Sequence, residues 1–364
     1  MGTRPEAIKF APLIKLLEKD PAFELRICIT GQHKEMLRQV LDFFGIVPHY
    51  DLNLMKHDQT LFDVSAAALT GMKPVLDDCK PDLVFVQGDT TTAFIGALAA
   101  FYEKIPVAHL EAGLRSGNKL SPFPEEANRR LVSVITDYHF APTGLAKDAL
   151  AKENIVDDVW VVGNTVVDAL FLGLENLGNR KIDFKNEFDY IDFAKPVVLI
   201  TAHRRESFGK PFEDICDAIL ETKNNHPAVQ FIYPVHFNPN VREVVNRKLA
   251  GKAGVFLIEP LDYARLIWLM EKAAVILTDS GGIQEEAPAL GKPVLVMRDV
   301  TERVEGIEAG TAKLVGTDKA VIVANLHALL ENENGIYDQM AKAVNPYGDG
   351  TTSKQIIAIL KSLK

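Results

Sequence analysis

The stretch Val275-Ile276-Leu277-Thr278-Asp279-Ser280-Gly281-Gly282-Ile283-Gln284-Glu285-Glu286-Ala287 joins an apolar run to a glycine pair and a helix start. An unbroken apolar run predicts a strand that is buried on both faces, as in a parallel sheet covered by helices. The glycine pair permits a tight turn and a close approach of the backbone to a ligand. A phosphate at the helix N-terminus and a plain strand-to-helix turn explain the glycine pair equally well at this stage.

The same alternation of apolar runs and helical patterns extends along the whole chain. It indicates the α/β class with doubly wound, open parallel sheets, here as two Rossmann-like domains. The predicted strands are 25–30, 83–87, 107–110, 138–141, 159–162, 197–201, 230–233, 255–258, 275–278 and 294–297. The helices predicted between them include 7–19, 34–44, 91–103 and 125–135.

The length of 364 residues favours two domains. A polar stretch of mixed charge at 177–193 is the best boundary, so the domains are predicted at 1–178 and 195–345. Ligands of such sheets bind at the carboxyl ends of the strands. Both domains are therefore expected to contribute to one cleft.

Composition and charge exclude several classes of protein. Acidic residues outnumber basic ones by 49 to 40, which leaves no broad basic surface for a nucleic acid. The longest apolar run, 94–102, is far shorter than the roughly 20 residues of a membrane helix, and the start of the chain does not resemble a secretion signal. Cys28, Cys79 and Cys216 form no close pair. These features predict a cytoplasmic protein without disulfides or a membrane anchor.

Ionisable residues follow several strands of the first half. Asp89 comes directly after the strand predicted at 83–87, although spacing alone favours the N-cap of the next helix over a catalytic role for it. His109 and Glu111 would share one face if their strand continued. No third ligand stands at a recognisable spacing, so we expect no metal site there. Glu125 begins a helix, where its charge could merely favour the helix dipole.

The second half carries histidines and arginines at its strand ends. His203 and His236 end successive predicted strands, and His203 precedes two arginines. Arg303 follows a further strand. A single histidine of this kind is usually structural, whereas the group favours an anion site.

Taken together, these segments resemble the non-hydrolysing UDP-N-acetylglucosamine 2-epimerases of bacteria and archaea. The resemblance covers almost the whole chain in order. It is carried by Gly-Thr-Arg-Pro-Glu-Ala-Ile-Lys (2–9), Gly-Asp-Thr-Thr-Thr (88–92), His-Leu-Glu-Ala-Gly-Leu-Arg (109–115), Pro-Glu-Glu-Ala-Asn-Arg (124–129), Gly-Asn-Thr-Val (163–166), His-Arg-Arg-Glu (203–206), Thr-Asp-Ser-Gly-Gly-Ile-Gln-Glu-Glu-Ala-Pro (278–288), Thr-Glu-Arg (301–303) and Asn-Pro-Tyr-Gly-Asp-Gly (345–350).

The resemblance implies a fold of the glycosyltransferase B type, whose last helix (351–364) packs back on the first domain. It implies a homodimer that interconverts UDP-GlcNAc and UDP-ManNAc without any cofactor or metal, for surface polysaccharide synthesis. Family members eliminate UDP to form 2-acetamidoglucal and then add UDP back. An inactive sensor of nucleotide sugars, a UDP-GlcNAc-dependent glycosyltransferase and a hydrolysing epimerase that releases ManNAc remain alternatives.

By matched position, the resemblance also implies the residues of the site. The catalytic group is Asp89, Glu111, Glu125 and His203. The substrate-binding group is Arg4, Lys9, Arg129, His236, Ser280, Gly281, Gly282, Glu286 and Arg303.

The chain departs from the family pattern in three places. Val304 stands where the family usually has proline after Thr-Glu-Arg. Some members bind a second UDP-GlcNAc as an activator. Gln32, His33 and His236 are kept here, but Glu35 and Asp58 replace a glutamine and an arginine, so we do not expect that activation. In the family a buried strand precedes Gly-Thr-Arg-Pro-Glu. We therefore expect the N-terminal sheet to lack its first strand.

Overall fold

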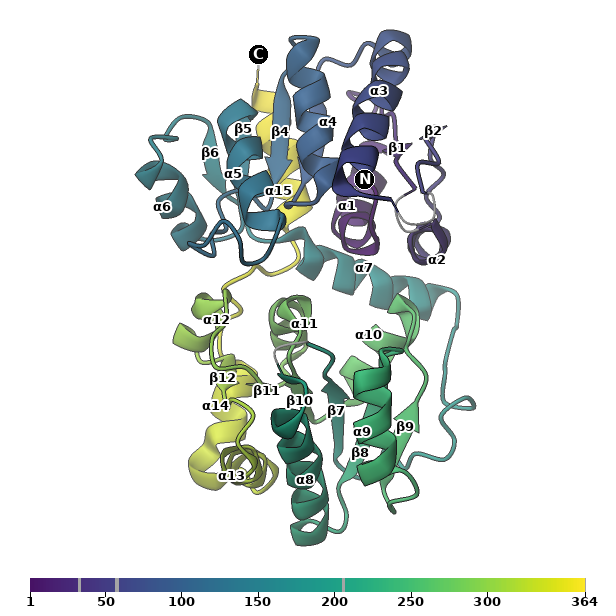
Figure 1. The fold of residues 1–364 in the computed structure, drawn as a ribbon, viewed down its shortest axis with the longest axis vertical. Coiled ribbons are helices and arrows are strands. Elements are labelled where there is room, and N and C mark those ends of the chain that lie inside the picture. Colours follow the sequence, from purple (N-terminus) through teal and green to yellow (C-terminus); the bar gives the residue numbers. More distant parts are fainter. Residues whose placement is uncertain (32–33, 56–58, 205–206, 364) are drawn as a thin grey trace. The chain divides into compact units, whose positions relative to one another are not determined.

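A computed structural model describes residues 1–31, 34–55, 59–204 and 207–363. The chain divides into two compact units (Figure 1). Unit 1 comprises Met1–Gly173 and Tyr347–Lys364, and unit 2 comprises Leu174–Pro346. The boundaries at 178, 195 and 345, and a cleft between the domains, stay predictions. Within the described residues, no helix is both long and apolar enough to cross a membrane.

Unit 1 has its strands in separate parallel sheets. Strands β3 (Val84–Gln87), β4 (Val107–Leu110), β5 (Tyr138–Ala141) and β6 (Val159–Val161) lie side by side in that order. Among the assigned strands of the described residues, the short strand β1 (Cys28–Ile29) forms a separate sheet with β2 (Tyr50–Asp51). The helices assigned to this unit are α1 (Arg4–Leu17), α2 (Lys34–Phe44), α3 (Leu61–Cys79), α4 (Thr91–Tyr102), α5 (Glu125–Ile135), α6 (Gly144–Lys152) and α15 (Thr352–Ser362), and α7 (Thr165–Asn179) runs on into unit 2.

A cavity of about 640 Å³, lined mainly by apolar side chains, lies between β1 and β3. Leucines of α1 and the side chains of Met72 and Leu76 on α3 contribute to its lining. Beside it, Met1 N donates a hydrogen bond to Cys28 O (3.0 Å), and Met1 O accepts one from Thr30 N (3.0 Å). These bonds are the pattern of parallel strands. The cavity thus lies between the edges of the two sheets of unit 1, and the missing first strand stays a prediction.

Unit 2 contains one parallel sheet of six strands in the order β12-β11-β10-β7-β8-β9. Their bounds are β7 (Val197–Thr201), β8 (Gln230–Pro234), β9 (Val255–Ile258), β10 (Val275–Thr278), β11 (Val294–Val296) and β12 (Ala312–Leu314). The helices are α8 (Lys210–Asn225), α9 (Pro239–Leu249), α10 (Tyr263–Lys272), α11 (Gly281–Glu286), α12 (Val304–Glu308), α13 (Lys319–Leu330) and α14 (Ile336–Lys342). The side chains of Ile200, Phe231 and Leu277 are fully buried, as the apolar runs predict.

The predicted α/β class with Rossmann-like parallel sheets is confirmed, and most predicted elements fall within one or two residues of the observed ones. The strand predicted at 25–30 is too long, because only Cys28 and Ile29 have strand geometry. The prediction misses β2 and β12, which contain two and three residues. The first helix begins at Arg4 rather than at residue 7, because Thr3 and Glu6 form a capping box ahead of it.

Candidate active site

The loop after β3 places Asp89 beside α5. The side chain of Arg129, on α5, pairs with the Asp89 carboxylate, and Asn128 Nδ2 donates to Asp89 O (3.0 Å). The N-cap of α4 is Thr90, whose hydroxyl accepts from Ala93 N (3.0 Å). The simple role of helix cap for Asp89 is therefore wrong, and its carboxylate is held by a cation instead.

The loop after β4 carries Glu111, at the neighbouring strand end. Glu111 Oε2 lies 2.5 Å from Lys9 Nζ, and the amide of Gln87 also donates to it. The Lys9 and Glu111 side chains are 11% and 5% exposed, so this ion pair is shielded from solvent. A Cβ added to Gly88 would lie 3.9 Å from Glu111 Oε2, so the Glu111 carboxylate closely approaches the residue that precedes Asp89.

His109 and Glu111 do not share a face. The strand ends at Leu110, and Glu111 has a left-handed backbone with φ of 64°. The His109 ring lies 2.8 Å from Gly88 O through Nε2, and burial lowers its pKa to about 3. The assumption that His109 and Glu111 lie on one face, which a shared metal ion would require, is thus wrong. His109 is a buried neutral side chain.

The remaining site residues of unit 1 lie at helix starts. Glu125 is the first residue of α5, four residues before Arg129. Its Oε2 is buried without a hydrogen-bond partner in the described part of the chain. Arg4 is the half-buried first residue of α1, and Lys9 follows on the same helix. Unit 1 thus joins Asp89 to Arg129 and Glu111 to Lys9 at adjacent strand ends.

In unit 2, Asp279 organises the loops after β7 and β10. Its Oδ2 accepts from the backbone N–H groups of His203 (2.6 Å) and Arg204 (2.8 Å). His203 Nδ1 lies 3.4 Å from Asp279 Oδ1. The exposed ring of His203 stacks on that of His236 at 5.2 Å between centroids. Partial burial and, to a smaller extent, the neighbouring His203 lower the pKa of His236. The neutral form of the His236 ring is therefore favoured.

The glycine pair lies next to an arginine. Ser280 is the N-cap of α11, and its N–H donates to Thr278 Oγ1 (2.9 Å). A Cβ added to Gly281 would lie 3.4 Å from Arg303 Cζ. Arg303 Nε in turn donates to the buried Glu285 Oε1 (2.7 Å). The guanidinium group is therefore held beside the glycine backbone, which is a suitable arrangement for an anion.

The two acids of α11 have different partners. Glu286 is 5% exposed, and its Oε1 accepts from the hydroxyl of Tyr263 on α10 (2.9 Å). Gly282 lies close to it, since an added Cβ would be 3.8 Å from Glu286 Oε2. Glu285 binds Arg303, as described above. Of these two acids, the family resemblance assigns Glu286, and not Glu285, to substrate binding.

Some residues of these clusters are absent from the sequence-based prediction. Gln87 and Asp279 lie at the carboxyl ends of predicted strands, and that position could have identified them as candidate site residues. Tyr263 has no such signal, because it reaches Glu286 from a distant helix. Gln32, His33 and Asp58, and also Arg205 and Glu206 of the His-Arg-Arg-Glu segment, lie outside the described residues.

Parallel α/β units with ion pairs at the strand ends of one, and a glycine turn beside an arginine in the other, are typical of Rossmann-like enzymes that bind nucleotides. Comparison with known proteins gives the family. The family model described as UDP-N-acetylglucosamine 2-epimerase matches residues 15–361. The chain belongs to the UDP-N-acetylglucosamine 2-epimerase family, as the motifs predict.

Individual relatives are similar over nearly their full length. The chain is 53% identical to the UDP-N-acetylglucosamine 2-epimerase of Salmonella typhimurium, over 100% of this chain and 97% of the relative. The crystal structure of the Neisseria meningitidis UDP-GlcNAc 2-epimerase bound to UDP-GlcNAc matches with a TM-score of 0.92 and 50% identity, over 100% of this chain and 98% of that one. The Methanocaldococcus jannaschii enzyme in complex with UDP-GlcNAc and UDP matches with a TM-score of 0.80 and 35% identity, over 100% and 98% of the two chains.

Proposed function

We propose that this protein catalyses the reversible epimerisation of UDP-GlcNAc to UDP-ManNAc at C2, as a cofactor-free isomerase. The observation that carries the proposal is the family match across residues 15–361, which includes the strand-end residues of both units. The buried pair of Glu111 and Lys9 and the pair of Asp89 and Arg129 support it, because they supply acid–base groups at adjacent strand ends.

The reaction explains why several carboxylates are needed. The C2 proton is not next to a ketone, so simple deprotonation is very unfavourable. In elimination, a base takes the C2 proton, the C1–C2 double bond forms, and UDP leaves with the electrons of the C1–O bond. Addition of UDP then returns a proton to the other face of C2. Inversion therefore requires proton acceptors or donors on both faces, and we assign these roles to Asp89, Glu111 and Glu125 as a group.

In this proposal, unit 2 binds the UDP part of the substrate. Arg303 and His203 interact with the diphosphate, and the backbone at Ser280, Gly281 and Gly282 approaches it closely. Fixed donors at this position stabilise the charge that develops on the leaving diphosphate. The Glu286 carboxylate accepts hydrogen bonds from ribose hydroxyls, with Tyr263 holding its other oxygen. His236, stacked on His203, completes this set.

An exchange experiment tests the proposal. Purified protein incubated with UDP-GlcNAc in deuterated water should form UDP-ManNAc and place deuterium at C2 of both sugars. Absence of both would refute the proposal. Sugar transfer to an acceptor without exchange would instead support a glycosyltransferase, free ManNAc as the main product a hydrolysing epimerase, and tight binding without any product a sensor.

Single variants test the assigned carboxylates. Asp89→Asn and Glu111→Gln should each lower kcat by about 10²–10⁴-fold with an unchanged circular dichroism spectrum, because acid–base catalysis is lost. Glu24→Gln is the matched control, since the Glu24 side chain is 78% exposed and pairs with Arg26, two residues along the chain. Wild-type rates in both carboxylate variants would overturn their assignment.

We further propose that the protein works as a homodimer in the cytoplasm and supplies UDP-ManNAc for surface polysaccharide. Analytical ultracentrifugation tests the assembly, with a mass of about twice 40.2 kDa expected.

A further inference from the structure

The C-terminal ends of two long helices of unit 2 meet away from the candidate active site. His226 is the C-cap of α8, His327 lies in the last turn of α13, and Glu331 is the C-cap of α13. At the other end of α13, Lys319 Nζ pairs with Glu221 Oε2 of α8 at 2.8 Å. The two helices therefore run in the same direction, and the negative ends of both dipoles lie together. This position favours a cation.

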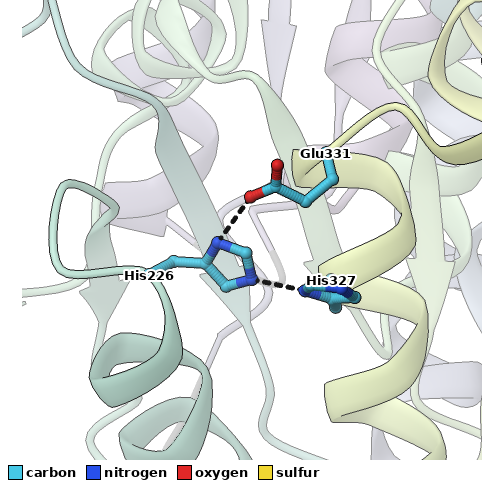
Figure 2. A group of neighbouring side chains, drawn as sticks. All are labelled: His226, His327 and Glu331. Atoms are coloured by element: carbon cyan, nitrogen blue, oxygen red, sulfur yellow. Dashed lines mark hydrogen bonds and ion pairs between the residues drawn. The ribbon is translucent and has the colours of Figure 1, made fainter.

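The side chains at this junction form a connected group, shown in Figure 2. His226 Nε2 lies 2.8 Å from His327 Nδ1, and His226 Nδ1 lies 3.1 Å from Glu331 Oε1. On its far side, His327 Nε2 lies 3.3 Å from Glu333 Oε1. Imidazole nitrogens with a carboxylate are ligands that zinc and similar transition metals prefer.

We propose that His226, His327 and Glu331 bind a divalent transition-metal ion of the zinc class. One potential ligand atom from each of the three residues lies within 4.8 Å of the others. Zinc bonded to nitrogen at about 2.0–2.1 Å in a tetrahedral site separates its ligand atoms by about 3.3 Å. The facing nitrogens, now 2.8 Å apart, would need to separate by about half an ångström. The His327 side chain is 48% exposed and has room for that shift.

Proton chemistry and the surrounding carboxylates agree with this site. A hydrogen bond between the two facing nitrogens requires one proton, and a metal ion takes the place of that proton. Glu333 Oε1 lies 3.3 Å from the opposite nitrogen of His327, and a carboxylate at that nitrogen is the usual way in which a metal-binding histidine is oriented. The carboxylate of Glu331 turns from His226 Nδ1 to become the third ligand. Water would complete the coordination.

The metal site is separate from the proposed catalysis. His226 precedes the amino end of β8, whereas His236 follows its carboxyl end. The proposed metal site and the candidate active site therefore lie at opposite ends of the strands. A metal ion at this site would link α13 to α8, and these two helices already pack against each other. We therefore expect a stabilising ion, and the inference stands whether or not the protein is an epimerase.

Isothermal titration calorimetry with zinc chloride tests the site on the full-length protein after treatment with EDTA. The wild-type chain should bind one ion at this site, and zinc should raise its Tm. His327→Gln and Glu331→Gln should each weaken that binding by about tenfold or more and abolish the rise in Tm. Cys79→Ser is the matched control, because thiols are the competing zinc ligands, and it should keep the wild-type affinity.

The outcomes decide the proposal directly. Zinc binding and a Tm increase that disappear in both ligand variants, but persist in Cys79→Ser, would support it. No zinc binding by the wild type, or the same affinity in His327→Gln, would overturn it.

Discussion

Replacing Gly113 with alanine should destabilise unit 1 and disturb Glu111. Gly113 lies in the loop after β4, two residues beyond Glu111, and has φ of 89°. A Cβ at this position would lie 2.2 Å from Ala146 O and 2.8 Å from Ala146 C, near the start of α6. Both are backbone atoms, so a side-chain rotation cannot relieve the overlap. The loop or α6 must move.

A second glycine in the same loop distinguishes the two contributions to the expected loss of stability, which are backbone strain and steric overlap. Gly117 also has a positive φ, 79°, but no described atom lies within 4 Å of an added Cβ. Gly117→Ala should therefore cost only the left-handed backbone strain, about 1–2 kcal/mol. Gly113→Ala adds an overpacking cost of about 1–3 kcal/mol. Its total is thus about 2–5 kcal/mol.

Thermal unfolding measures the difference between the two variants. At about 2–4 °C per kcal/mol, Tm should fall by about 4–20 °C in Gly113→Ala and by about 2–8 °C in Gly117→Ala. Epimerase turnover at a temperature where both variants are folded should fall only in Gly113→Ala, because the Glu111 loop shifts. Equal losses of Tm in the two variants would refute the argument from close approach.

Three further predictions concern acid stability, the cavity and the substrate. Burial lowers the pKa of His109 to about 3 and that of His139 to about 4, so below pH 6.5 the unfolded chain binds more protons than the folded one. The free energy of unfolding in urea should therefore fall by about 2 kcal/mol per histidine from pH 7 to pH 5, and His139→Gln should show a smaller fall. Five apolar β-branched residues added ahead of Met1 should fill the cavity beside β1 and raise the free energy of unfolding by a few kcal/mol, whereas a Gly-Ser extension of equal length should not. Tyr263→Phe removes the hydrogen bond to Glu286 and should raise KM for UDP-GlcNAc about tenfold with little change in kcat; an unchanged KM would contradict the ribose role.

Much of the fold could be predicted because its signals are local. The bounds of β4, β5, β7, β9 and β10 agree with the apolar runs that predict them. A buried parallel strand needs apolar side chains on both faces, and that requirement is visible in four or five consecutive residues. Strands β2 and β12 are too short to produce such a run.

The candidate site could be located, but the contacts of its residues could not. Asp89 and Glu111 are visible as acids at strand ends. Which cation each one meets depends on chain segments far away in the sequence: Arg129 is 40 residues from Asp89, and Lys9 is 102 residues from Glu111. Likewise, only the structure shows that Thr90 caps α4 and leaves the Asp89 carboxylate to Arg129.

The sequence by itself thus determined the α/β class, the family and the strand ends that carry the chemistry. Tertiary structure alone decided the ion pairs, the left-handed turn at Glu111, the cavity between β1 and β3, and the meeting of His226 with His327. The physical reason is that secondary structure and burial follow from neighbouring residues. Contacts between distant side chains follow from the order in which strands and helices pack.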